Sequence, residues 1–224
     1  MIMKAWFVFF FLLLASASYA QTMMIGARGG VNLANEAITK TLYPENTAFL
    51  AELLGGGQLD YQFSNTWALS LQLLYDQKGA HIDMGPGYSN WTTSYLELPL
   101  LVKMSFGSGA LRPYLFAGPS IGYLLSNIQH IHTNGSYFVP DGVGAWYPID
   151  TAADITDSTA KIDFSLIAGA GLSLQLASGT ALFFDAAYAY GFINSDNYSW
   201  DKADGISVYS RDIRLAAGVL FPLN

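Results

Sequence analysis

Residues 95–106, YLELPLLVKMSF, alternate between two kinds of side chain. The even positions are all apolar, whereas the odd positions hold Glu97, Pro99 and Lys103. A period of two is typical of a β-strand, because successive side chains point to opposite faces. One face of this strand must therefore lie against hydrocarbon, and the other must accept charged groups.

The same two-faced pattern recurs along the chain and predicts eight strands. Four further segments show it clearly, namely 66–78, 161–176, 181–192 and 212–221, and three show it weakly, namely 23–33, 49–63 and 112–127. The connections at 64–66, 107–111 and 178–179 are short, whereas those at 34–48, 80–92, 128–160 and 194–207 are long. Short turns on one side and long loops on the other are expected of an outer-membrane barrel. A soluble lipocalin-like barrel would turn its apolar face inward and has no reason to keep this asymmetry.

Composition supports a membrane barrel. The chain has 224 residues, of which 52% are hydrophobic and only 12% are charged, against about a quarter charged in soluble domains. Outside the first 20 residues, no apolar run is long enough to cross a bilayer as a helix. The net charge of -7 comes without any basic cluster, which argues against nucleic acid as a partner. The absence of cysteine excludes disulfides and a lipid-modified cysteine anchor.

Residues 1–20 are predicted to be a secretory signal peptide. Lys4 precedes an apolar stretch from Ala5 to Leu14, and the small residues of ASASYA follow it. An N-terminal membrane anchor is the alternative, but the apolar stretch is short. We expect cleavage after Ala20, which leaves residues 21–224 as a single barrel domain.

Aromatic residues lie near several predicted strand ends, as an interfacial girdle requires, although a soluble β-sandwich core could also place them there. The segments GARGGVNLA, YLELPLLVKMSF, RPYLFAGPSIGYLLS, DFSLIAGAGLSL and FFDAAYAYGFIN resemble successive strands of the PorT-like, OmpX-like outer-membrane β-barrel family of Gram-negative bacteria. This resemblance implies a single antiparallel eight-stranded barrel in the bacterial outer membrane. It implies little about activity, because the functions of this family are mostly unassigned.

Charged residues on the polar face are predicted to line the barrel interior. An eight-stranded barrel is just wide enough to be filled by side chains, so buried charges there must be paired. Parity predicts a balanced lumen charge network made of Arg28, Glu52, Glu97, Lys103, Asp185 and Arg214. We favour a filled, salt-bridged plug over a conductive polar pore.

Evidence for an enzyme or a metal site is thin. The three histidines, His81, His130 and His132, all fall in predicted loops. His130 and His132 lie on one side of QHIHTNG if it is extended, which makes them a possible loop ligand site for a transition metal. Two histidines without a third ligand more often stand exposed to solvent, so we predict no catalytic residue, no metal and no cofactor.

The leading interpretation is a non-enzymatic, integral outer-membrane protein with a structural or surface-interaction role, in adhesion or as a secretion accessory. Its expected partners are outer-membrane lipid and a protein or surface ligand at the extracellular loops, and we expect a monomer. The aromatic, Gly/Pro-rich segment YFVPDGVGAWYP within 128–160 suits such a recognition surface. The alternatives are a small pore or ligand-binding barrel and, third, an enzyme that modifies envelope lipids.

Overall fold

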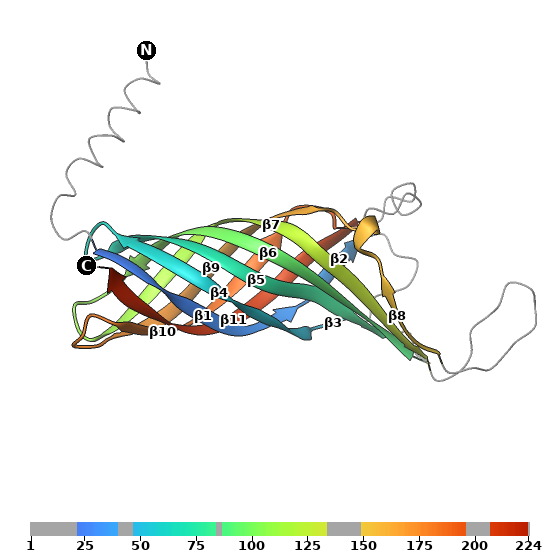
Figure 1. The fold of residues 1–224 in the computed structure, drawn as a ribbon, viewed down its shortest axis with the longest axis horizontal. Coiled ribbons are helices and arrows are strands. Elements are labelled where there is room, and N and C mark those ends of the chain that lie inside the picture. The colour runs from blue at the N-terminus through green and yellow to red at the C-terminus, as the bar shows by residue number, and fades with distance from the viewer. Residues whose placement is uncertain (1–21, 40–46, 84–86, 134–148, 196–206, 224) are drawn as a thin grey trace, which may run out of the picture.

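Eight long antiparallel strands form a closed barrel (Figure 1). The computed structural model describes residues 22–39, 47–83, 87–133, 149–195 and 207–223. In barrel order the strands are β1 (Thr22–Ala34), β4 (Leu50–Gln62), β5 (Trp67–Asp83), β6 (Gly87–Ser105), β7 (Leu111–Thr133), β9 (Ile162–Gln175), β10 (Ala181–Gly191) and β11 (Ser207–Leu223). The barrel closes where β1 pairs with β11, from Met23 opposite Leu223 to Leu33 opposite Ile213. The predicted signal peptide lies outside the described residues and stays a prediction.

Three short strands extend the wall at one end. β2 (Glu36–Thr39) pairs with β11, β3 (Thr47–Ala48) pairs with β5, and β8 (Ile149–Asp154) pairs with β7. One turn of 3-10 helix, η1 (Thr156–Ser158), follows β8. Among the described residues, no helix is long and apolar enough to cross a bilayer.

The three short connections all lie at the end of the barrel where β1 begins and β11 ends (Figure 1). They span residues 63–66, 106–110 and 176–180. Gly107 and Gly179 have φ angles of 79° and 82°, a left-handed conformation that side chains other than glycine rarely adopt. The predicted asymmetry of short periplasmic turns and long extracellular connections is therefore confirmed.

The two faces of each strand meet different surroundings. On β6, Leu98 and Leu100 point outward with 44% and 42% of their surface exposed, whereas Glu97 and Leu101 point inward and are 1% and 2% exposed. Pro99 also points inward and is fully buried. The β5–β6 ladder is interrupted beside Pro99, which has no N–H group to donate.

Three predicted loops are partly wrong, and the first is 34–48, which contains β2 and β3. β5 continues to Asp83 and β6 begins at Gly87, so most of residues 80–92 is a strand hairpin, and β7 continues to Thr133. His81 therefore lies on β5, and His130 and His132 lie on β7, rather than in loops. These extensions rise above the lipid, so neither face of the strands has to be apolar. The alternation of apolar and polar residues that marked the other strands is therefore absent here.

Candidate functional site

The interior holds two groups of ion pairs, one above the other along the barrel. The group nearer the short turns, the periplasmic tier, consists of Arg28, Asp60, Lys103, Tyr114 and Asp185. Arg28 Nη2 lies 2.7 Å from Asp185 Oδ1, and the Tyr114 hydroxyl donates to the other oxygen of Asp185 at 2.8 Å. Lys103 Nζ lies 2.7 Å from Asp60 Oδ2 and 4.6 Å from the centre of the Tyr114 ring. Two cations meet two carboxylates, so this tier is electrically balanced.

The group farther from the short turns, the outer tier, consists of Asp76, Lys78, Glu97, Asp163, Asp212 and Arg214. Lys78 Nζ lies 2.5 Å from Glu97 and 2.6 Å from Asp163. Arg214 lies 2.7 Å from Asp76 and 2.9 Å from Glu97. Glu97 thus joins both cations, and four strands are tied together by these contacts.

Asp212 is the exception in the outer tier. Its side chain is fully buried, yet neither carboxylate oxygen has a hydrogen-bond partner among the described residues. Counted as ionised groups, the outer tier holds two cations and four carboxylates. Small residues face it from the neighbouring strand, since Asp212 lies directly opposite Ala189 of β10.

Five of the six predicted lumen residues lie in these tiers. Arg28, Lys103 and Asp185 belong to the periplasmic tier, and Glu97 and Arg214 to the outer tier. The sixth does not join them. Glu52 is half-buried on β4, accepts a hydrogen bond from Thr92 Oγ1 at 2.7 Å, and makes no ion pair with any described residue, so the structure places it outside both tiers. The β4–β5 pairing stops at Leu54, before Glu52 is reached.

Sequence reasoning left five charged residues out of the network, namely Asp60, Asp76, Lys78, Asp163 and Asp212. Four of them lie on the polar face of the clearly alternating segments, so the alternation alone would have been enough to place them in the interior. Asp60 lies in the glycine-rich β4, where the alternation is weak. Its partner Lys103 is 43 residues away in sequence, and the contact follows only from barrel closure.

Side chains fill the space between and around the tiers. Leu101, Tyr114, Phe116, Ile167 and Phe183 form a buried apolar cluster. The ion-paired side chains of both tiers are between 0% and 11% exposed. The barrel is hollowed at the periplasmic mouth, where Lys103 and Arg112 border a space of about 480 Å³ that is open to solvent. A side-chain plug of this kind favours a closed interior.

At the opposite end, β5, β6, β7 and β8 continue past the rest of the wall as a ribbon (Figure 1). His81, Tyr88 and His132 form a row of rings across it, with centroids 5.3 Å and 5.2 Å apart. His132 Nδ1 lies 4.0 Å from Asp150, and His81 Nδ1 lies 2.6 Å from Asn90 Oδ1. We call β5–β8 above the barrel, residues 79–83, 87–93, 128–133 and 149–154, the extracellular ribbon.

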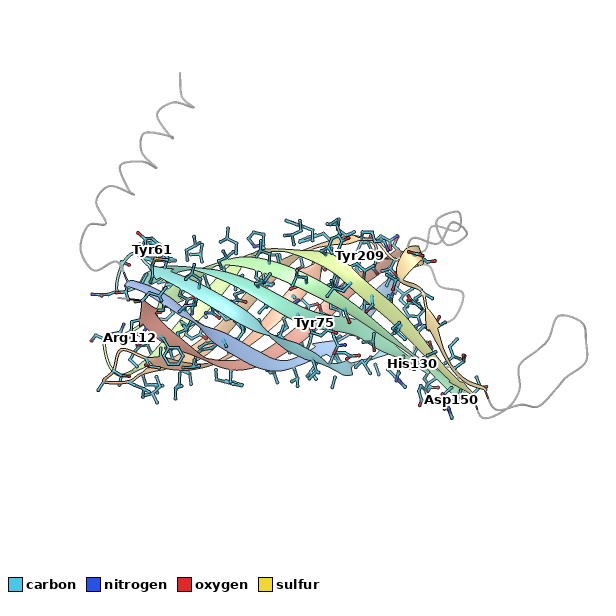
Figure 2. The ribbon with its side chains drawn as sticks, viewed as in Figure 1. Tyr61, Tyr75, Arg112, His130, Asp150 and Tyr209 are labelled. Carbon is cyan, nitrogen blue, oxygen red and sulfur yellow. The ribbon has the colours of Figure 1, made fainter. Side chains whose placement is uncertain are left out.

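The two histidines of the predicted ligand site lie on this ribbon. Figure 2 shows His130 and Asp150 close to its tip, far from Arg112. His130 is exposed and pairs with Asn90 of β6 in register. Within the described part of the chain, no three His, Cys, Asp or Glu side chains converge as metal ligands would. Farther down, Thr156 donates hydrogen bonds to the exposed Asp154, which lowers the pKa of its carboxyl.

A closed barrel with an apolar outer wall and a charged, filled interior defines an integral protein of the bacterial outer membrane. The chain belongs to the outer membrane protein beta-barrel domain family, whose sequence model matches residues 19–197. No curated protein matches the sequence.

Solved structures of other outer-membrane proteins are similar to this chain at low sequence identity. OprG of Pseudomonas aeruginosa is 12% identical, with a TM-score of 0.45 over 92% of this chain and 97% of its own. Ail, the attachment invasion locus protein of Yersinia pestis, is 14% identical, with a TM-score of 0.39 over 90% and 97%. The outer membrane protease OmpT of Escherichia coli is 6% identical, with a TM-score of 0.38 over 92% and 99%.

Proposed function

We propose that this barrel is a non-enzymatic, monomeric outer-membrane protein with a structural or surface-interaction role, in adhesion or as a secretion accessory. The observation that carries the proposal is the extracellular ribbon. Its paired strands rise past the lipid-facing wall and hold exposed polar and aromatic side chains in fixed positions, which is how rigid scaffolds present binding residues. The filled interior supports a role at the surface rather than through the barrel.

Within the outer-membrane barrel family, we propose membership of the PorT-like, OmpX-like group. The support is the segments YLELPLL and PYLFAGPSIGYLL, which form the adjacent strands β6 and β7. The ligand at the surface is proposed to be a protein or another surface molecule, bound at the ribbon and its loops.

A pull-down from envelope extract and culture medium tests the surface role. The bait is purified barrel in lipid nanodiscs, compared with a variant in which residues 134–148, which join β7 to β8, are replaced by a short Gly/Ser linker. The matched control replaces the periplasmic turn 106–110 by Gly/Ser of equal length. We expect a partner that the intact barrel and the turn variant retain and the loop variant loses. Equal retention by all three baits would contradict a surface role for this end.

The alternative is a small pore or ligand-binding barrel, which the hollow at the periplasmic mouth favours. Single-channel recording in planar bilayers separates the two. We expect no steady conductance, because the ion-paired tiers and the apolar cluster occupy the interior. Stable, ion-selective channels would instead support the pore. An enzyme acting on envelope lipids is the third candidate, and it would require a lipid-modifying activity that His130→Ala abolishes.

A further inference from the structure

The outer wall of β11 is apolar until it reaches one arginine. From the periplasmic end, the outward side chains are Leu223, Phe221, Val219, Ala217, Leu215 and Ile213, and the next one is Arg211. Arg211 is half-buried and lies directly opposite Tyr190 of β10, whose ring also faces outward. A cation thus ends the lipid-facing row of this strand.

Arg211 lies at the height of the lipid headgroups. It is twelve residues from Leu223 on β11, which at about 3.3 Å per residue and a tilt of about 40° places it roughly 30 Å above the periplasmic edge. The apolar band of such barrels is about 25 Å tall. Tyr209, the next outward residue, lies at the opposite end of the barrel from Tyr61 (Figure 2). The cation therefore reaches the outer leaflet just above the acyl chains.

The guanidinium is held in place but keeps part of its donor capacity. Its central carbon lies 3.6 Å from the centre of the Tyr190 ring. One nitrogen, Nη1, donates to the backbone oxygens of Gly191 at 3.0 Å and Ser210 at 2.7 Å. Among the described residues, Nε and Nη2 have no hydrogen-bond acceptor, and no carboxylate lies within ion-pair distance of the group. Every cation of the two interior tiers, by contrast, has a carboxylate partner.

The surroundings of Arg211 suit a lipid more than a soluble anion. Tyr190 and Phe192 are in ring contact at 5.1 Å, and Phe192 and Phe164 at 6.3 Å, so an outward aromatic row runs from β9 to β10 beside the cation. Aromatic rings of this kind settle at the membrane interface. A planar guanidinium with adjacent free N–H groups matches the oxygens of a phosphate.

We propose that Arg211, stacked on Tyr190, binds the phosphate group of a lipid in the outer leaflet. The bound lipid would lay its chains along the apolar wall of β9, β10 and β11 and bring its phosphate to Nε and Nη2 of Arg211. This site lies on the membrane-facing wall and needs no partner at the extracellular ribbon, so it shares with the proposed surface role only the orientation of the barrel in the membrane.

Native mass spectrometry of the full barrel in detergent tests this site. The probes are diphosphorylated lipid A, the same lipid without phosphate, and inorganic phosphate. We expect the wild type to retain the phosphorylated lipid in preference to the other two probes. Arg211→Gln should weaken retention about tenfold, which corresponds to the loss of one charge-assisted hydrogen bond. Arg211→Lys should recover only part of it, because an ammonium lacks the planar fork.

Lys161→Gln is the matched control. It removes the same charge at the same end of the barrel, but Lys161 lies 3.6 Å from the exposed Asp157 and outside the aromatic row. Equal losses for Arg211→Gln and Lys161→Gln would mean general surface attraction, and no loss for Arg211→Gln would mean no site; either result overturns the proposal.

Tyr190→Leu, which keeps the apolar wall and removes the stacking, should weaken retention of the phosphorylated lipid severalfold and provides a second variant if Arg211→Gln does not fold. Retention of inorganic phosphate as strong as that of the lipid would also overturn it.

Discussion

At the scale of single residues, Glu97 and Asp212 share the outer tier but differ in their surroundings. Glu97 contacts both Lys78 and Arg214, whereas the equally buried Asp212 has no hydrogen-bond partner among the described residues. Removal of one member of a buried ion pair leaves the other charge unpaired in a medium that solvates it poorly. Removal of a charge that has no direct partner relieves a desolvation cost instead. Two carboxylates in one cluster should therefore respond oppositely to neutralisation.

We expect Glu97→Gln to lower the free energy of unfolding by about 3 to 5 kcal/mol, the usual cost of breaking a buried pair. Asp212→Asn should leave it unchanged or raise it. The measurement is urea unfolding of each variant refolded into lipid vesicles, with the wild type in the same vesicles as reference. A loss for Asp212→Asn as large as that for Glu97→Gln would show that Asp212 is paired, through groups other than the described side chains.

At the scale of the strand, alternation predicted the faces well. Leu100 and Leu101 are adjacent and chemically identical, yet one is 42% exposed and the other 2%, as the parity of residues 95–106 requires. The same rule failed beyond Lys78 on β5 and beyond Asn127 on β7, because strands above the lipid need no hydrocarbon face. At Glu52 it predicted the inner face correctly, because Glu52 lies opposite the buried Asn32 of β1, but it could not predict that Glu52 makes no ion pair with a described residue.

Partner choice inside the barrel lies beyond what alternation can predict. Lys78 of β5 pairs with Asp163 of β9, 85 residues away in sequence. Parity placed both on the inner face, but their meeting depends on the tilt and stagger with which the strands close. The sequence therefore predicts which charged residues point inward. It does not predict that they divide into a balanced periplasmic tier and an acidic outer tier.

The lipid-facing row of β6 supports a prediction about depth. Leu100 lies near the middle of the apolar row that runs from Leu96 to Phe106. Leu100→Arg should cost about 2 to 4 kcal/mol, and Phe106→Arg, at the periplasmic edge, about 1 kcal/mol or less, because the cost of a cation falls toward the interface. Urea unfolding in vesicles measures both. Equal costs at the two positions would contradict the placement of this strand across the bilayer.

At the scale of the whole molecule, the two ends of the barrel differ in kind. One end carries three short turns and the periplasmic hollow, and the other carries the extracellular ribbon (Figure 1). Arg211 lies on the outer wall at the ribbon end, and among the described residues it is the cation of that wall that has no carboxylate within ion-pair distance. Orientation in the membrane therefore decides what each feature can meet: the ribbon meets the medium, and Arg211 meets the outer leaflet.

This orientation can be tested with one protease and two insertion sites. A recognition sequence for a specific protease is inserted after residue 140, between β7 and β8, or after residue 108, in a short turn, and the protease is added to intact cells. The first site should be cut, while the barrel fragments stay in the membrane because the strands remain paired and sheathed in lipid. The second site should be cut only after the cells are broken. Cleavage of the second site alone in intact cells would invert the topology, and with it the proposed surface role of the ribbon and the outer-leaflet position of Arg211.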